Sequence, residues 1–203
     1  MSRRLPQQSA RSPLQSAALV ALACLAGVAA HGAVLWVALD SQPAAPYDTR
    51  ETGLRSIQAA VDAAQAGDTV RVAAGTYTER ITVPRSLTIE GEGMASSTLD
   101  GAGGGSCVTV QAGAALTLRL LALRNGKAES GGGLFALNAD AELDRVLVAD
   151  CQAGRGGGIY LKQGYLRLSA CVIEYCRALE SLATSGGKGA ASIFCTARRR
   201  ARR

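Results

Sequence analysis

The sequence predicts an all-β protein, a solenoid of stacked parallel strands, and three observations support this prediction. Residues 118–126, 143–151 and 168–176 align with one another at a constant offset of 25 residues. The glycine triplets at residues 131–133 and 156–158 share this offset, and a short apolar run follows each of them. Glycine is abundant, with 24 residues, whereas aromatic residues make up only 4% of the chain. A repeat of this length marks identical supersecondary units that share one core, and the composition suits short strands and tight turns.

The N-terminal 39 residues predict export. Residues 1–16 are a basic region, and residues 17–39 contain no Asp, Glu, Lys or Arg. Such a stretch is long enough to span a bilayer, and the basic flank keeps its N-terminal side in the cytoplasm. The segment is a signal anchor, a signal peptide cleaved after Val28-Ala29-Ala30, or a segment lipidated at Cys24. We therefore expect the body outside the cytoplasm in the cell envelope, either membrane-tethered through residues 17–39 or secreted.

The entry to the repeat follows a linker. Residues 40–53 contain two prolines and no periodicity, so they are interpreted as a linker, and the body is predicted for residues 54–180. We expect Ser56 to cap a short helix that ends at Gly67 and covers the N-terminal end of the stack. Alternation then predicts strands at residues 69–72, 81–83 and 87–89, separated by turns at residues 75–77 and 84–86, which together make one triangular coil.

Residues one coil apart in a parallel stack lie about 4.8 Å from each other and form columns along the axis. Three apolar columns are predicted to point inward: Leu118, Leu143 and Leu168; Leu123, Val148 and Ile173; Leu121, Val146 and Cys171. They predict about four coils with a period of about 25 residues. A leucine-rich repeat is disfavoured because Gly126 stands where that motif needs Asn.

The net charge of +6 comes from the two ends of the chain. Eight arginines lie within the first 11 or the last six residues, so residues 40–197 carry about two more negative than positive charges. This excludes a basic face for nucleic acid. The alternation stops near residue 180, and residues 181–203 are expected to be an irregular basic tail. Without a closing coil, we expect a truncated or frame-shifted member of a longer protein, or a tail that folds back or meets a partner.

Residues 56–93 carry a resemblance to a known family. They read SIQAAVDAAQAGDTVRVAAGTYTERITVPRSLTIEGEG, a short helix followed by Gly-Asp, Gly-Thr-Tyr and a strand with a Gly-rich turn. This pattern resembles the N-terminal entry of right-handed parallel β-helix proteins of the pectin-lyase-like superfamily, and the resemblance extends over residues 54–180. It implies a right-handed parallel β-helix. It does not imply one activity, because that superfamily includes lyases, hydrolases, epimerases, adhesins and phage tail proteins.

The chemistry is less clearly indicated than the fold. Lyases of this fold use a basic side chain to abstract a proton while calcium held by carboxylates neutralises the developing charge. The weak candidates for such a site are Asp144, Arg145 and Asp150, with Asp140 and Glu174 as further outward acids. Asp144 aligns with Arg119 and Ser169, and Asp150 aligns with Asn125 and Tyr175, so no acidic column forms. His31, the single histidine, precedes the body, which disfavours hydrolase chemistry.

Two functions are therefore predicted. The first is an exported, non-catalytic module that presents a surface to a glycan, a protein or another cell-envelope component. The alternative is a divergent or remnant polysaccharide-processing enzyme of the pectate-lyase type, and only this alternative requires calcium; no other cofactor is expected. The short turns build no wall around a cleft and favour the first function.

Cys151 and Cys176 are in phase, so adjacent coils bring them close together. They are predicted to form either a disulfide or an unbridged thiol stack, with Asn125 one coil before Cys151. An exported protein meets an oxidising compartment, which favours the disulfide. Parallel neighbouring strands, however, place the two Cβ vectors side by side, which is poor disulfide geometry.

Overall fold

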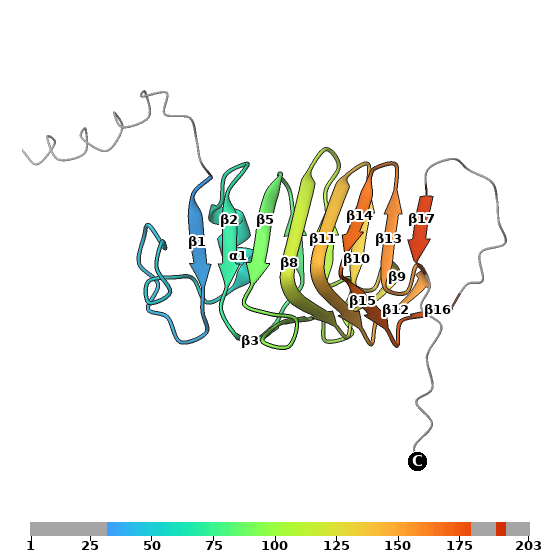
Figure 1. The fold of residues 1–203 in the computed structure, drawn as a ribbon, viewed down its shortest axis with the longest axis horizontal. Coiled ribbons are helices and arrows are strands. Elements are labelled where there is room, and N and C mark those ends of the chain that lie inside the picture. The colour runs from blue at the N-terminus through green and yellow to red at the C-terminus, as the bar shows by residue number, and fades with distance from the viewer. Residues whose placement is uncertain (1–31, 180–189, 194–203) are drawn as a thin grey trace, which may run out of the picture. The chain divides into compact units, whose positions relative to one another are not determined.

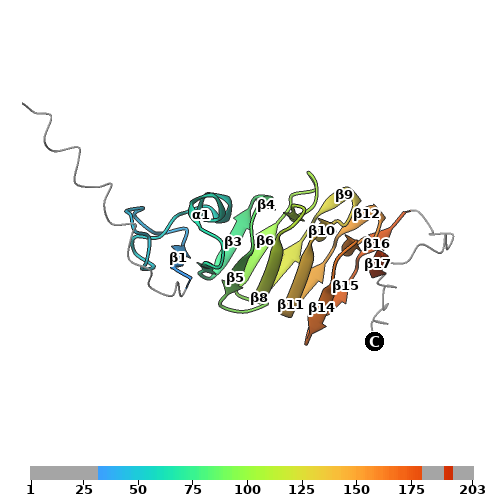
Figure 2. The same cartoon turned by 90° about the horizontal axis from the view of Figure 1, so that it is seen from above.

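The structure, a computed structural model, describes residues 32–179 and 190–193. These residues form a stack of strands with a short helix near one end (Figures 1 and 2). Sheet A contains β1 (Val34–Val37), β2 (Thr69–Val72), β5 (Leu87–Gly91), β8 (Ala115–Arg124), β11 (Asp140–Ala149) and β14 (Leu166–Ser169), with β3 (Gly75–Thr78), β6 (Ser97–Asp100) and β15 (Val172–Glu174) beside this path. Sheet B contains β4 (Ile81–Val83), β7 (Val108–Val110), β10 (Leu134–Leu137), β13 (Ile159–Lys162) and β17 (Ala190–Ile193). Sheet C contains β9 (Lys127–Ser130), β12 (Gln152–Arg155) and β16 (Arg177–Ala178).

The strand registers confirm a parallel β-helix of about four coils. Complete coils run from β2 to β4, β5 to β7, β8 to β10 and β11 to β13, and β14 to β16 begin another. Leu143 pairs with Leu118 on one side and with Leu168 on the other, which is the predicted offset of 25 residues. The earlier coils differ, because Thr69 pairs with Thr88 and Leu87 pairs with Leu116, offsets of 19 and 29. The period of about 25 residues therefore describes the later coils only.

The predicted columns build the core. Leu118 and Leu143 are fully buried, as are Leu123 and Val148 in the second column. In the last coil the first column leaves Leu168 exposed over 37% of its surface. The core is thus continuous along the stack and loses its cover at the end formed by β14 and β15.

Residues with positive φ form the corners between strands. Leu120, Arg145 and Ala170 are one coil apart and have φ of 54°, 52° and 49°. Each bends the chain between the two halves of its coil. Asn125, Asp150 and Tyr175 repeat the same conformation at the next corner, with φ of 55°, 56° and 54°. A side chain in this conformation costs roughly 1–2 kcal/mol, so the repeated corners are imposed by pairing between coils.

The glycine triplets form tight turns between sheets C and B, as predicted. The Gly132 N–H donates to Gly157 O at 3.0 Å, one coil further on. A Cβ atom on Gly132 would lie 2.6 Å from Gly157 O and 2.7 Å from Gln152 O. Because this approach is too close for any side chain, only glycine fits between the stacked turns.

The N-terminal helix covers one end of the core. Helix α1 (Ile57–Ala63) has Ser56 as its N-cap, with the Ala59 N–H donating to Ser56 Oγ at 3.2 Å. It ends at the C-cap Ala64, three residues before the predicted Gly67, and it buries Ile57, Ala60 and Val61. The carboxylate of Glu79 accepts hydrogen bonds from Ser56 Oγ and Ile57 N, both at 2.7 Å, and from Gln58 N at 3.1 Å. A residue from the first coil thereby caps the helix.

The predicted boundary at the N-terminus is wrong. Residues 34–37 form strand β1, parallel to β2, rather than the end of the signal or anchor segment predicted for residues 17–39. The predicted linker packs on the outer edge of β1, because the Trp36 N–H donates to Tyr47 O and the Leu54 N–H donates to Trp36 O, both at 2.8 Å. The β-helix therefore begins at β1, whereas residues 1–31 lie outside the described part of the chain. Across residues 32–179 and 190–193, no helix has the length and apolar character needed to cross a membrane.

Two further predictions need correction. Residues 75–78 form strand β3, paired with β6, rather than a turn, and β5 begins the second coil rather than closing the first. Residues 190–193, within the predicted irregular tail, form β17, which pairs antiparallel with β13. In both places pairing with a neighbouring strand decides the local structure where the sequence alone indicated no strand.

Candidate functional site

The structure separates the residues predicted for catalysis. Asp144 accepts hydrogen bonds from Arg145 Nε at 3.3 Å and from Arg145 Nη2 at 3.1 Å. Asp150 instead accepts from Arg124 Nη1 at 3.0 Å. The chain turns at Arg145, and the second half of β11 lies between this corner and Asp150. Asp144 and Arg145 therefore lie together at one corner, and Asp150 lies at the next.

The other outward acids do not join them. Asp140 Oδ1 accepts from the Tyr165 N–H at 2.8 Å, and Glu174 lies in β15, beyond the Asp144 corner. Among the residues that the structure describes, no three His, Cys, Asp or Glu side chains are grouped in a way that could hold a metal ion.

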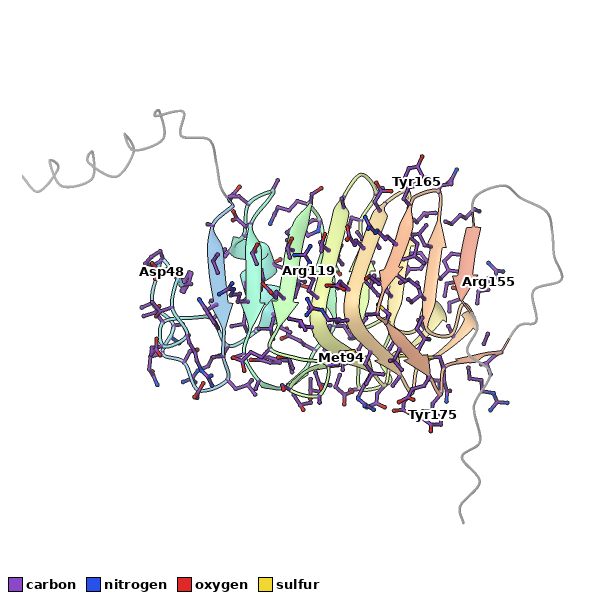
Figure 3. The ribbon with its side chains drawn as sticks, in the orientation of Figure 1. Asp48, Met94, Arg119, Arg155, Tyr165 and Tyr175 are labelled. Atoms are coloured by element: carbon purple, nitrogen blue, oxygen red, sulfur yellow. The ribbon has the colours of Figure 1, made fainter. Side chains whose placement is uncertain are left out.

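The outer face of sheet A carries a column of alternating charge. In register along the stack lie Trp36, Arg71, Glu90, Arg119 and Asp144. The Arg71 guanidinium lies 5.6 Å from the centre of the Trp36 ring, and Arg71 Nε lies 3.8 Å from Glu90 Oε2. Arg119, in the middle of this face, is labelled in Figure 3. Its positive and negative side chains balance, so this column favours neither an anionic nor a cationic ligand.

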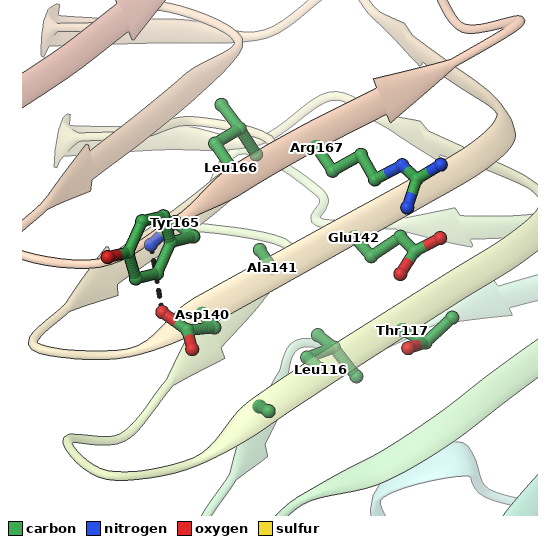
Figure 4. A pocket seen from close by; sticks show the side chains of 9 residues that line it. Leu116, Thr117, Asp140, Ala141, Glu142, Tyr165, Leu166 and Arg167 are labelled. Atoms are coloured by element: carbon green, nitrogen blue, oxygen red, sulfur yellow. Dashed lines mark hydrogen bonds between the residues drawn. The ribbon is translucent and has the colours of Figure 1, made fainter.

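A first pocket lies where β8, β11 and β14 begin. It has a volume of about 420 Å³, and Thr117, Glu142 and Arg167 line it from three successive coils. Figure 4 shows Glu142 and Arg167 on adjacent strands, with the carboxylate of Asp140 bonded to the Tyr165 backbone. Two acids and one arginine leave this pocket slightly acidic.

A second pocket lies between sheets B and C and has a volume of about 410 Å³. Phe135 and Tyr160, in register on β10 and β13, stack with ring centres 5.9 Å apart and an interplanar angle of 6°. Arg155, which is labelled in Figure 3, Lys162 and Glu129 bring charged groups to the same pocket. Ser106 and Ser130 add hydroxyl groups. We call this site the B–C pocket; it combines an aromatic pair, hydroxyl groups, two cations and one carboxylate.

The B–C pocket was not predicted from the sequence, although the sequence carries a signal for it. The runs that follow the two glycine triplets, LFAL and IYLK, are in phase and place Phe135 beside Tyr160. Arg155 aligns with Ser130 of the preceding coil, and Lys162 aligns with Leu137, so the later coil brings two cations to this pocket.

Three cysteine side chains lie near one another along the stack. Cys107, Cys151 and Cys176 are buried free thiols. The residue one coil before Cys151 is Gly126 rather than Asn125, as the pairing of Gln152 with Lys127 shows. The Gly132 carbonyl and the Cys107 sulfur together take up the space beside Gly126, because a Cβ atom there would clash with Gly132 O and lie 2.9 Å from the sulfur.

The three thiols interact along the axis. The hydrogen bond from Cys151 lowers the pKa of Cys107, and the contact with Cys107, together with burial, raises the pKa of Cys151 to about 12. The contact with Cys151, followed by burial, raises the pKa of Cys176. Raised pKa values hold Cys151 and Cys176 in the thiol form at neutral pH, which makes them weak nucleophiles.

Comparison with known proteins gives a likeness in fold only. No protein-family model matches the chain, and no curated protein matches its sequence. Two crystal structures of pectin methylesterase in complex with hexasaccharides resemble it, with TM-scores of 0.49 and 0.48 and 18% sequence identity. Each match covers 69% of this chain and 48% of the pectin methylesterase chain, so the chain spans about half the length of these proteins. By its own strand registers, the chain is a parallel β-helix repeat protein.

Proposed function

We propose that this protein is an exported, non-catalytic β-helix module that binds an acidic polysaccharide at the B–C pocket. The observation that carries the proposal is the side-chain set of this pocket. Phe135 and Tyr160 form an aromatic pair, and Arg155 and Lys162 outnumber the single carboxylate of Glu129. Flat apolar surface suits the C–H face of a sugar ring, and guanidinium and ammonium groups bind carboxylates.

Charge separates the B–C pocket from the first pocket. The residues that line the B–C pocket include two cations and one carboxylate, whereas those that line the first pocket include two carboxylates and one cation. An anionic chain such as a polyuronate is therefore attracted to the B–C pocket and repelled by the pocket at the start of β8, β11 and β14. This difference selects the B–C pocket and the acidic class of glycan.

The non-catalytic part of the proposal follows from the positions of the candidate catalytic residues. The Asp144 carboxylate accepts a hydrogen bond from Arg145, and the Asp150 carboxylate accepts one from Arg124 at another corner. A lyase needs its base and its charge-neutralising groups around one substrate atom. Asp144, Arg145 and Asp150 do not surround one point in this way, so they do not support the lyase alternative.

Export is proposed from residues 17–31 together with strand β1. Because β1 takes up residues 34–37, an anchor would have to pass directly into a buried strand without a linker. A signal peptide cleaved after Ala30 would release the chain three residues before β1 and fits this boundary better. N-terminal sequencing of the exported protein should then begin at His31, and a chain that retains residues 1–30 would contradict cleavage.

Binding can be measured by titrating the full-length chain with oligogalacturonate and, separately, with a neutral oligosaccharide of the same length. We expect binding of the acidic oligosaccharide alone, weakening as salt is added. Lys162→Met should lower the affinity by about tenfold, the effect of losing one charge-assisted hydrogen bond. Arg167→Met, in the first pocket, is the matched control and should leave affinity unchanged. Equal binding of both oligosaccharides, or equal effects of the two substitutions, would rule out this site.

A further inference from the structure

The chain contains two asparagines, Asn125 and Asn138, and both lie at corners between strands. Both are exposed, and both have a positive φ, 55° for Asn125 and 54° for Asn138. They differ in the residue that follows, which is glycine after Asn125 and alanine after Asn138. Because glycine has no Cβ atom, its backbone nitrogen is the least hindered one that a preceding asparagine side chain can meet. The two corners therefore provide a comparison within one chain.

Packing fixes glycine at position 126. A Cβ atom there would clash with Gly132 O and would lie 2.9 Å from the sulfur of Cys107. In the next coil the same position carries Cys151, so the stack accepts a side chain there in one coil and excludes it in the preceding one. Asn125 is therefore followed by glycine for a structural reason.

Weak contacts hold the side-chain amide and the backbone nitrogen at this corner. The Asn125 Nδ2 donates to Asp100 Oδ2 at 2.9 Å, and this hydrogen bond is exposed. The Gly126 N–H donates to the sulfur of Cys151, which is a weak acceptor. The Asn125 N–H reaches Ala149 O at 3.4 Å, beyond the usual range for such a bond. Both groups therefore leave their partners at low cost.

We propose that Asn125 is a site of spontaneous deamidation. A base removes the Gly126 amide proton, and the nitrogen forms a bond to the side-chain carbonyl carbon of Asn125. The bond from this carbon to Nδ2 breaks, and ammonia leaves after taking a proton from water. A water molecule then opens the resulting succinimide at one of its carbonyl carbons, which yields aspartate or isoaspartate. The net reaction turns one amide and one water into one carboxylate and one ammonium ion, so water is the only co-reactant.

The product changes the charge and the backbone of this corner. A carboxylate at position 125 loses the hydrogen bond to Asp100 and faces that carboxylate instead, with Asp150 at the same corner of the next coil. Like charges at this distance repel each other. Isoaspartate also adds one carbon to the main chain before Gly126, whose carbonyl oxygen accepts from the Gln152 N–H at 2.8 Å. Both products weaken the corner, and isoaspartate also disturbs the pairing of β9 with β12.

The test is peptide mapping of the full-length chain by mass spectrometry during incubation at mildly alkaline pH. We expect the deamidated fraction of Asn125 to grow about tenfold faster than that of Asn138, because only Asn125 precedes a glycine. Asn125→Gln is the control, since glutamine would have to close a larger ring, and its peptide should keep its mass. Equal rates at the two asparagines, or a faster change at Asn138, would overturn the proposal. This comparison uses the unchanged chain, so it does not depend on whether a variant folds.

Two variants test the contacts of the corner. Asp100→Ala frees the amide and should speed the deamidation of Asn125 about fivefold, the factor that one exposed hydrogen bond contributes. Asn125→Asp carries the new charge from the start and should lower the thermal unfolding midpoint, as prolonged incubation of the unchanged chain does. An incubated chain that is deamidated at Asn125 but keeps its original midpoint would contradict the proposed weakening of the corner.

Discussion

The two ends of this β-helix are closed in different ways. At the N-terminal end, the outer edge of β1 is occupied by backbone hydrogen bonds with Tyr47 and Leu54, and helix α1 buries Ile57 and Val61 against the core. At the other end, the outer edges of β14, β15 and β16 have no partner strand among the described residues. The strands themselves are of one kind throughout. What differs is the presence of a loop and a helix outside the repeat, so closure in this fold comes from non-repeating sequence.

The apolar column of Leu118, Leu143 and Leu168 is buried in the middle of the stack and partly exposed at its end. Leu143 is fully buried between coils, whereas Leu168, its in-register partner, keeps 37% of its surface exposed. Each of these leucines has a leucine of the preceding coil on one side. Only Leu143 has a further coil on its other side, so the two contribute differently to stability. Burial, rather than position in the repeat, sets what each contributes to stability.

The largest expected effect tests this difference. Leu143→Ala should lower the free energy of unfolding by about 3 kcal/mol, because it leaves a cavity between two packed coils. Leu168→Ala should lower it by less than about 1 kcal/mol, because the removed atoms are partly solvated already. Urea unfolding of both variants gives the two values. Equal losses would mean that the last coil is covered in solution.

A smaller effect is expected from the N-terminal cap. Glu79→Ala removes the acceptor of three hydrogen bonds from Ser56, Ile57 and Gln58 and should cost about 2 kcal/mol. Glu79→Gln keeps one carbonyl acceptor and should cost about half as much. Glu90→Ala, which removes a partly exposed ion pair with Arg71, is the control and should cost less than about 1 kcal/mol. If Glu79→Ala cost no more than Glu90→Ala, the helix would not hold this end closed.

Sequence periodicity was sufficient to predict the interior of the stack. Leu118, Leu143 and Leu168 align because parallel pairing repeats one register in every coil, and an apolar residue at a fixed phase faces the same core. Ser56 was predicted correctly as a cap because its hydroxyl accepts from the helix N-terminus locally. Local and repeated interactions leave a pattern in one sequence.

Interactions outside the repeat left no such pattern. Strand β1 lies within the segment predicted as a signal anchor or signal peptide, because a buried strand and a membrane segment are both apolar runs. Cys107 joins the thiol stack from a different phase, since only the folded chain brings it to the gap at Gly126. In the B–C pocket, Phe135 and Tyr160 were visible in phase, but Arg155 and Glu129 come from another sheet. Contacts between different sheets depend on how the corners turn the chain, which composition and spacing do not specify.

The smallest expected effect concerns Tyr77, which ties β1 to the first coil. Its hydroxyl lies 3.2 Å from Val37 O and 3.1 Å from Ala73 O, and burial raises its pKa from 10.0 to about 12. Tyr77→Phe should cost about 1 kcal/mol at neutral pH through the lost hydrogen bond. Above pH 10 the unfolded chain ionises this phenol first, so the stability that Tyr77 contributes is retained below pH 10 and lost as the pH rises toward 12.

The advantage of the unchanged chain over Tyr77→Phe should therefore fall between pH 10 and 12, by up to about 1.4 kcal/mol per pH unit, and should change sign before pH 12. Tyr175→Phe, at the exposed corner of the opposite end, is the matched control and should cost less than Tyr77→Phe at neutral pH, because Tyr175 is 49% exposed. Unfolding midpoints of the three proteins measured across this pH range supply the comparison. A pH-independent difference for Tyr77→Phe would mean that the phenol is solvated and that β1 is not held by it. The N-terminal end would then depend on the Glu79 cap and the edge contacts of β1 alone.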